Sequence, residues 1–165
     1  MTPEQGKVMA RFFLDTMKSE SEVTKKVIRA VPDDMKAYKP EPKSMTAHEL
    51  AWHIATSEVW FLNLVLTGKP DMAEQAPAPP TISAVLDWYQ SNYGAKVTEI
   101  ERLAADKLVE KIPFFGLMEL PAVSYLNMMN LHSAHHRGQL STYLRPMGSK
   151  VPSIYGGSAD EPFQG

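Results

Sequence analysis

The sequence predicts an all-α protein, a four-helix bundle with long connecting loops, in a single domain that spans residues 1–165. Three observations support this prediction. Four long segments repeat apolar residues at the helical period, stretches rich in proline and glycine separate them, and no segment shows convincing strand alternation. A chain of 165 residues is also long enough to bury a core. A bundle of this kind can hold a site between facing helices.

The first helix is predicted over residues 2–30. Thr2 can cap it, Pro3 suits the first helical position, and Gln5 lies where a capping box needs it. The proline-rich stretch 32–43 then ends the helix and predicts a loop. The apolar face of the helix is assigned to a set of large residues: Val8, Phe12, Met17, Val23, Val27 and Val31.

The second helix is predicted from a capping box of Thr46 and Glu49 to about Thr67. One face carries His53 together with five residues at helical spacing: Leu50, Ser57, Trp60, Phe61 and Leu64. A helix that is apolar on nearly all sides is usually buried on nearly all sides, and the far side here is also apolar, with Trp52, Ala55, Val59, Leu62 and Leu66. Either this helix is central, or its far side contacts a partner subunit, which predicts an interface around Trp52, Val59 and Leu66.

The remaining elements follow from breakers and periodicity. A connection rich in proline and alanine, residues 70–80, precedes a third helix predicted over residues 81–105. Residues 107–120 are interpreted as a loop that contains a short strand-like piece. The fourth helix is predicted over residues 121–145, because a proline suits its first turn and a Pro-Met-Gly sequence follows it. The tail is predicted to be irregular.

Composition excludes several classes of function. The chain has no cysteine, which excludes disulfides, thiolate ligands and a cysteine nucleophile. A net charge of -2 gives no reason to expect nucleic acid or an anionic membrane as a partner. No signal-peptide pattern and no apolar run long enough to span a bilayer is apparent. We therefore expect a cytoplasmic protein whose partner is a small-molecule substrate.

The histidines of the fourth predicted helix suggest a metal site. His132 and His136 are one helical turn apart and point, like Tyr125 and Tyr143, into the apolar stripe. An unpartnered polar ring in a core is costly. Together with His53 on the second helix, these rings form the ligand set of an open metal site with three imidazoles. The alternative is that they are core histidines bonded to buried carbonyls or tyrosines.

Other candidates near these rings are weaker. Glu58 could supply a fourth ligand or a carboxylate behind a ligand, although a solvated glutamate is the expectation. His135 is expected outside the ligand set, and His48 is expected to be solvated. Gln139 could bind substrate, orient a ligand or bond to another helix. Gly138 is expected to allow a neighbouring helix to approach closely.

Two segments resemble a known family. The segment from His132 to Gly148, HxxHHRGQLxxYLRxxG, resembles the final-helix signature of the DinB (YfiT-like) family of metal-dependent proteins, and residues 46–58, TAHELAWHIAxxE, resemble its second-helix segment. The resemblance implies an up-down-down-up four-helix bundle and, commonly, a homodimer. It also implies a divalent metal ion, zinc or nickel in different members, held by three histidines that correspond here to His53, His132 and His136.

The resemblance also bears on activity. Family members with known activity are similar to thiol S-transferases, which join low-molecular-weight thiols to electrophiles, or to a thiol-dependent isomerase. We therefore predict a divalent-metal-binding protein that acts as a metal-dependent thiol S-transferase on small electrophiles, with a low-molecular-weight thiol as cosubstrate. The alternatives are a metal-dependent hydrolase and a non-catalytic bundle that binds a small molecule or dimerises. The sequence identifies no catalytic residue.

Overall fold

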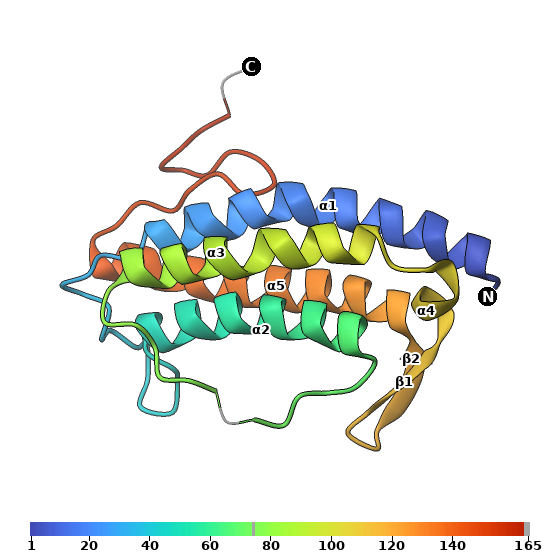
Figure 1. Cartoon of the computed structure of the whole chain (residues 1–165). Coiled ribbons are helices and arrows are strands. Elements are labelled where there is room, and N and C mark those ends of the chain that lie inside the picture. The colour runs from blue at the N-terminus through green and yellow to red at the C-terminus, as the bar shows by residue number, and fades with distance from the viewer. Residues whose placement is uncertain (74, 164–165) are drawn as a thin grey trace.

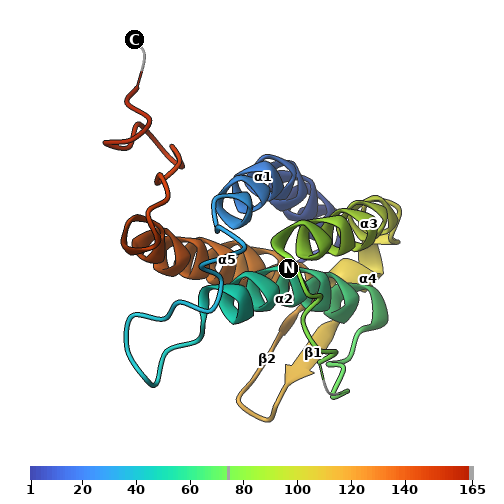
Figure 2. The same cartoon turned by 90° about the vertical axis from the view of Figure 1, so that its left-hand side faces the viewer.

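The structure is a computed structural model, and it describes residues 1–73 and 75–163. Its four long helices are α1 (Pro3–Arg29), α2 (Ala47–Thr67), α3 (Ile82–Glu101) and α5 (Ala122–Leu144). α1 and α5 run one way along the bundle, and α2 and α3 run the other way (Figure 1). α3 and α5 each pack against both α1 and α2, which lie diagonally opposite each other (Figure 2). The predicted all-α, up-down-down-up bundle is confirmed.

Both predicted capping boxes are present. The Thr2 hydroxyl accepts a hydrogen bond from the backbone N–H of Gln5, whose side chain accepts one from the N–H of Thr2. Thr46 and Glu49 form the same reciprocal pair at the start of α2. These bonds satisfy N–H groups that have no partner within a helix, so they fix where each helix begins.

The predicted buried face of α1 is confirmed at Met17, Val27 and Val31, which are buried, but not at the start of the helix. Val8 and Phe12 are 71% and 68% exposed, so their assignment to the core is wrong. At this end α1 packs against the short helix α4 (Ala105–Val109), and the contact is so close that a Cβ on Gly6 would lie 2.5 Å from Cγ1 of Val109. Close packing here requires a small residue at Gly6. The apolar pattern could not show this, because it assigned the core to large apolar side chains such as Val8 and Phe12.

The far side of α2 is buried inside this chain. Trp52 packs edge to face on Trp88 of α3, with ring centroids 4.6 Å apart, and its indole N–H donates to the Ala76 carbonyl at 2.8 Å. Val59 is buried as well. The alternative of a central α2 is therefore the one observed, since Trp52 and Val59 are buried within the chain and Leu66 is half-buried. The homodimer stays a prediction.

The connection between α2 and α3 returns along the length of the bundle, because these two helices run parallel (Figure 1). Side chains of α2 hold it in place. The Trp60 indole donates to the Asp71 carbonyl at 2.9 Å, and Nε2 of His48 lies 2.8 Å from the Pro79 carbonyl oxygen. His48 is thus half-buried against this connection, and the prediction that it is solvated is wrong.

The region after α3 departs most from prediction. α3 ends at Glu101 rather than near residue 105, where α4 begins. Strands β1 (Lys111–Phe114) and β2 (Met118–Pro121) then form an antiparallel hairpin in which Ile112 pairs with Leu120. The loop predicted for residues 107–120 is therefore wrong for most of its length, and the strand-like piece within it is confirmed.

After α5 the chain turns back onto α1. A 3-10 helix, η1 (Arg145–Met147), ends at Gly148 in the left-handed conformation, with φ 77°. The Ser149 hydroxyl then donates to the Ala30 carbonyl at 2.6 Å, and Lys26 pairs with Glu161 at 2.6 Å. Within the described residues, no helix combines the length and apolar character needed to cross a bilayer.

Candidate metal centre

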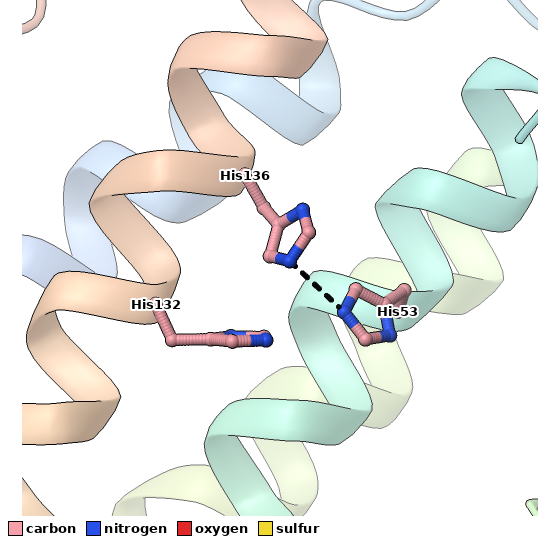
Figure 3. Close-up of side chains that lie close together, drawn as sticks. All are labelled: His53, His132 and His136. Atoms are coloured by element: carbon pink, nitrogen blue, oxygen red, sulfur yellow. Dashed lines mark hydrogen bonds between the residues drawn. The ribbon is translucent and has the colours of Figure 1, made fainter. Parts of the chain in front are cut away.

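Three histidines from two facing helices meet inside the bundle (Figure 3). His132 and His136 lie one turn apart on α5, and His53 faces them from α2. One nitrogen of each ring lies within 4.8 Å of the others, and Nε2 of His53 is 3.2 Å from Nε2 of His136. The structure therefore brings together the three rings that the sequence singled out.

The geometry and chemistry of this group fit a divalent cation. Two nitrogens bound to one tetrahedral zinc at about 2.0–2.1 Å are about 3.3 Å apart, which matches the His53–His136 separation. Nδ1 of His132 is buried and has no hydrogen-bond partner among the described residues. A buried polar nitrogen without a partner is costly, so this ring is not explained as an ordinary hydrogen-bonded core histidine. Three imidazoles would leave a fourth coordination position free for water or substrate.

All three rings are electrically suited to bind a cation. Burial, together with the neighbouring rings of His136 and His53, lowers the pKa of His132 to about 4. Burial and then the His136 ring lower the pKa of His53. Burial also lowers the pKa of His136, against a smaller opposing effect of its bond to Gln139. The rings are therefore neutral at pH 7, the form in which imidazole donates a lone pair.

Neighbouring polar groups orient two of the rings. Oε1 of Gln139 lies 3.0 Å from Nδ1 of His136, so it accepts a hydrogen bond from Nδ1–H and leaves the lone pair on Nε2. The Ser57 hydroxyl lies 3.4 Å from Nδ1 of His53. Gln139 thus orients a ring of the histidine group, and its other contact, to Tyr143 at 3.5 Å, is within α5 rather than to another helix.

Three further candidates lie outside this group. Glu58 is only 2% exposed, so the prediction of a solvated glutamate is wrong: it accepts hydrogen bonds from Thr24 and Tyr89 in the core. His135 is exposed on α5. A Cβ on Gly138 would meet no atom within 4 Å, so the prediction of a close helix approach there is wrong.

The buried polar network around Glu58 was missed at the sequence level. Thr24 donates to the Glu58 carboxylate at 2.8 Å and lies 3.1 Å from Arg137, which pairs with Glu20. Burial raises the pKa of Glu58, while the hydroxyl of Tyr89 and the charge of Arg137 act in the opposite direction. One sequence observation could have predicted this burial: Glu58 lies in a helix that is apolar on nearly all its other sides.

Two pockets open next to the histidines. The first, which we call the aromatic pocket, has a volume of about 480 Å³, includes His53 and His132, and is lined by Trp52, Trp60, Phe61, Trp88, Phe114 and Phe115. The second, which we call the polar pocket, has a volume of about 470 Å³, shares His53 and Trp52 with the first, and is lined by Lys43, Ser44, Glu49 and Gln75. Phe114 and Phe115 lie in the hairpin that sequence reasoning interpreted as a loop.

Comparison with known proteins gives consistent matches along the chain. The family model described as "DinB family" matches residues 7–163. The protein YrdA of Bacillus subtilis is 30% identical over 151 residues, which cover 90% of this chain and 89% of YrdA. The crystal structure of the DinB-like protein YjoA from Bacillus subtilis has a TM-score of 0.70 and 27% identity, and the match covers 86% of this chain and 96% of that one. A DinB-like protein from Bacillus cereus has a TM-score of 0.72 and 25% identity, with 87% and 95% covered.

Proposed function

Because this chain belongs to the DinB family, whose model matches residues 7–163, we propose that it is a metal-dependent thiol S-transferase. The observation that carries the proposal is the approach of three imidazole nitrogens, from His53, His132 and His136, to within 4.8 Å of one another. These residues would hold a divalent cation, with zinc or nickel as the candidates, and a low-molecular-weight thiol would be the cosubstrate.

The chemistry proposed is the joining of a thiol sulfur to an electrophilic carbon. A bound cation would supply positive charge that lowers the pKa of the thiol and favours the thiolate. The thiol proton passes to solvent, the sulfur electron pair forms the S–C bond, and the leaving group departs with the electrons of the broken bond. The neutral rings of His53, His132 and His136 would contribute the ligand nitrogens, and the walls of the aromatic pocket would hold the electrophile beside them.

Two pockets that share His53 favour transfer between two substrates over hydrolysis. A hydrolase needs one pocket for its substrate and a water molecule, whereas a transferase must hold two molecules beside the same reactive point. The aromatic pocket suits an apolar electrophile. The polar pocket offers the ammonium group of Lys43 to a carboxylate of the thiol cosubstrate.

The test begins with metal content. We expect protein purified without a histidine tag to hold one equivalent of metal per chain, and His53→Ala to lose most of it. His135→Ala is the matched control, since His135 is an exposed neighbour of the histidine group and should leave the metal content unchanged. Full metal content in His53→Ala would contradict the proposed ligand set.

Activity is the second part of the test. Turnover of 1-chloro-2,4-dinitrobenzene should require an added thiol and stop when the metal is removed with a chelator. Turnover of ester or amide substrates without thiol would instead identify a hydrolase. A protein that binds no metal and catalyses neither reaction would be a non-catalytic bundle.

A further inference from the structure

Two separate parts of the chain contribute the stacked aromatic rings of the aromatic pocket. α2 contributes Trp60 and Phe61, and the hairpin contributes Phe114 and Phe115. Trp60 is nearly parallel to Phe115, with centroids 5.9 Å apart, and Phe61 is nearly parallel to Phe114, with centroids 6.4 Å apart. The two pairs stand edge to face to one another, since Trp60 and Phe61 meet at 85°. They therefore offer both ring faces and ring edges to an occupant.

Hydrogen bonds fix two of the three indole rings of this pocket, those of Trp52 and Trp60, and use their polar atoms. The Trp60 N–H donates to the Asp71 carbonyl at 2.9 Å, and the Trp52 N–H donates to the Ala76 carbonyl at 2.8 Å. These N–H groups are satisfied by the connection between α2 and α3, so they are not available to a ligand. The indoles of Trp52 and Trp60 can therefore recognise an occupant only through their apolar faces and edges.

Phe115 occupies a backbone position that phenylalanine rarely adopts. Its φ is 52° and that of Gly116 is 72°, and the Leu117 N–H donates to the Phe114 carbonyl at 2.9 Å. This is a type I′ turn, in which asparagine, aspartate or glycine is preferred at the first central position. Phe115 is also 49% exposed, so burial does not account for a bulky ring at a strained position. Its ring stands against Trp60 at the rim of the pocket.

We propose that the aromatic pocket binds a planar aromatic electrophile, with Phe115 and Trp60 as the residues that select for a flat ring. The reaction of this electrophile rests on the proposed function, but its binding does not, because the aromatic walls are formed by protein side chains alone. His53 and His132 line the same pocket, so a ring stacked there lies beside the proposed metal ligands.

The binding test uses 1-naphthol and its saturated counterpart decahydro-1-naphthol with metal-free protein, by isothermal titration calorimetry. We expect 1-naphthol to bind at one site per chain and roughly fivefold more tightly than the saturated compound, because only the aromatic ring can stack. Equal affinity for the two compounds, or no binding of 1-naphthol, would overturn the proposal.

Variants locate the binding. Trp60→Leu and Phe115→Asn should each weaken 1-naphthol binding by about two- to tenfold, the range for one aromatic contact. Phe115→Asn keeps the hairpin intact, since Asn-Gly is a preferred pair in this turn. Phe12→Ala is the control, because Phe12 is an exposed phenylalanine on α1 and is not part of the pocket. Wild-type affinity in both pocket variants would contradict the assignment.

The two proposals fail separately. If the protein holds no metal when it is purified without a histidine tag, yet binds 1-naphthol selectively, the metal-dependent transferase is refuted and this inference stands. One equivalent of metal and thiol-dependent turnover, without any preference for the flat ring, would refute this inference alone.

Discussion

His136 has a close neighbour at each of its two ring nitrogens. Nε2 faces His53, and Nδ1 faces the side-chain oxygen of Gln139. The sequence predicted the convergence of these rings, since helical spacing places His132 and His136 on one face. It left the role of Gln139 open, and it gave the wrong surroundings for Glu58, because spacing along one helix does not show what packs on its other sides.

The contact between Gln139 and His136 predicts a change in metal affinity. Gln139→Leu removes the acceptor that fixes the imidazole tautomer while keeping a side chain of similar size. Metal affinity should fall about tenfold, the lower end of the range for losing such a partner. Competition with a chromophoric chelator measures the affinity. Gln90→Leu, at an exposed position on α3, should bind as the wild type does, and equal affinity in the two variants would contradict the assignment.

Stability of the metal-free protein should depend on pH through these rings. Burial lowers the pKa of His132 from 6.5 to about 4, so between these values the unfolded chain takes up a proton that the folded chain does not. The contribution of His132 to the free energy of unfolding is therefore highest above pH 6.5 and falls as the pH falls toward 4. Urea midpoints measured across this range should fall less steeply for His132→Leu than for the wild type. Parallel curves would show that His132 does not contribute.

At the scale of elements, helix starts could be predicted and the hairpin could not. Capping boxes are local, so Thr2 and Thr46 mark the beginnings of α1 and α2 without knowledge of the fold. The hairpin lacks the usual turn signal, because its type I′ turn contains Phe115 and Gly116 rather than Asn-Gly. Val8 and Phe12 at the start of α1 were misassigned to the core for a different reason, since packing there depends on how closely α4 approaches Gly6.

The contact between α1 and α4 predicts that Gly6→Ala changes the folding stability in opposite directions with and without the Val109 side chain. Gly6→Ala alone should destabilise the protein by about 1 kcal/mol, because the new methyl group meets Val109 and the overlap outweighs the helix propensity gained. In a Val109→Ala background the same change should stabilise by about 0.5–1 kcal/mol. Urea unfolding of the four proteins completes a double-mutant cycle. An identical effect in both backgrounds would exclude the contact.

At the scale of the whole molecule, one buried polar chain connects all four long helices. Glu20 and Thr24 of α1, Glu58 of α2, Tyr89 of α3 and Arg137 of α5 are linked by hydrogen bonds or an ion pair. Charges of this kind are costly to bury alone, so each partner depends on the others. The network lies in the core rather than at the histidine group, and it accounts for a charged arginine inside the bundle.

This network predicts unequal effects for two arginines near the end of the chain. Arg137→Leu should destabilise the protein by about 3 kcal/mol, because Arg137 is 1% exposed and its loss leaves Glu20 without its partner. Arg145→Leu should cost less than about 1 kcal/mol, because Arg145 is exposed to solvent in its ion pair with Asp160. Chemical denaturation of both variants measures the difference. Equal losses would mean that the buried network contributes nothing beyond a surface pair.

The return path between α2 and α3 has a consequence for how this protein can diverge. The described residues of this path have no regular secondary structure, yet their backbone carbonyls anchor two of the three indoles that line the aromatic pocket. Insertions or deletions there would leave every helix in register while moving a wall of the pocket. Selectivity for a substrate can therefore be rewritten in a stretch of loop, with the metal ligands and the bundle left untouched.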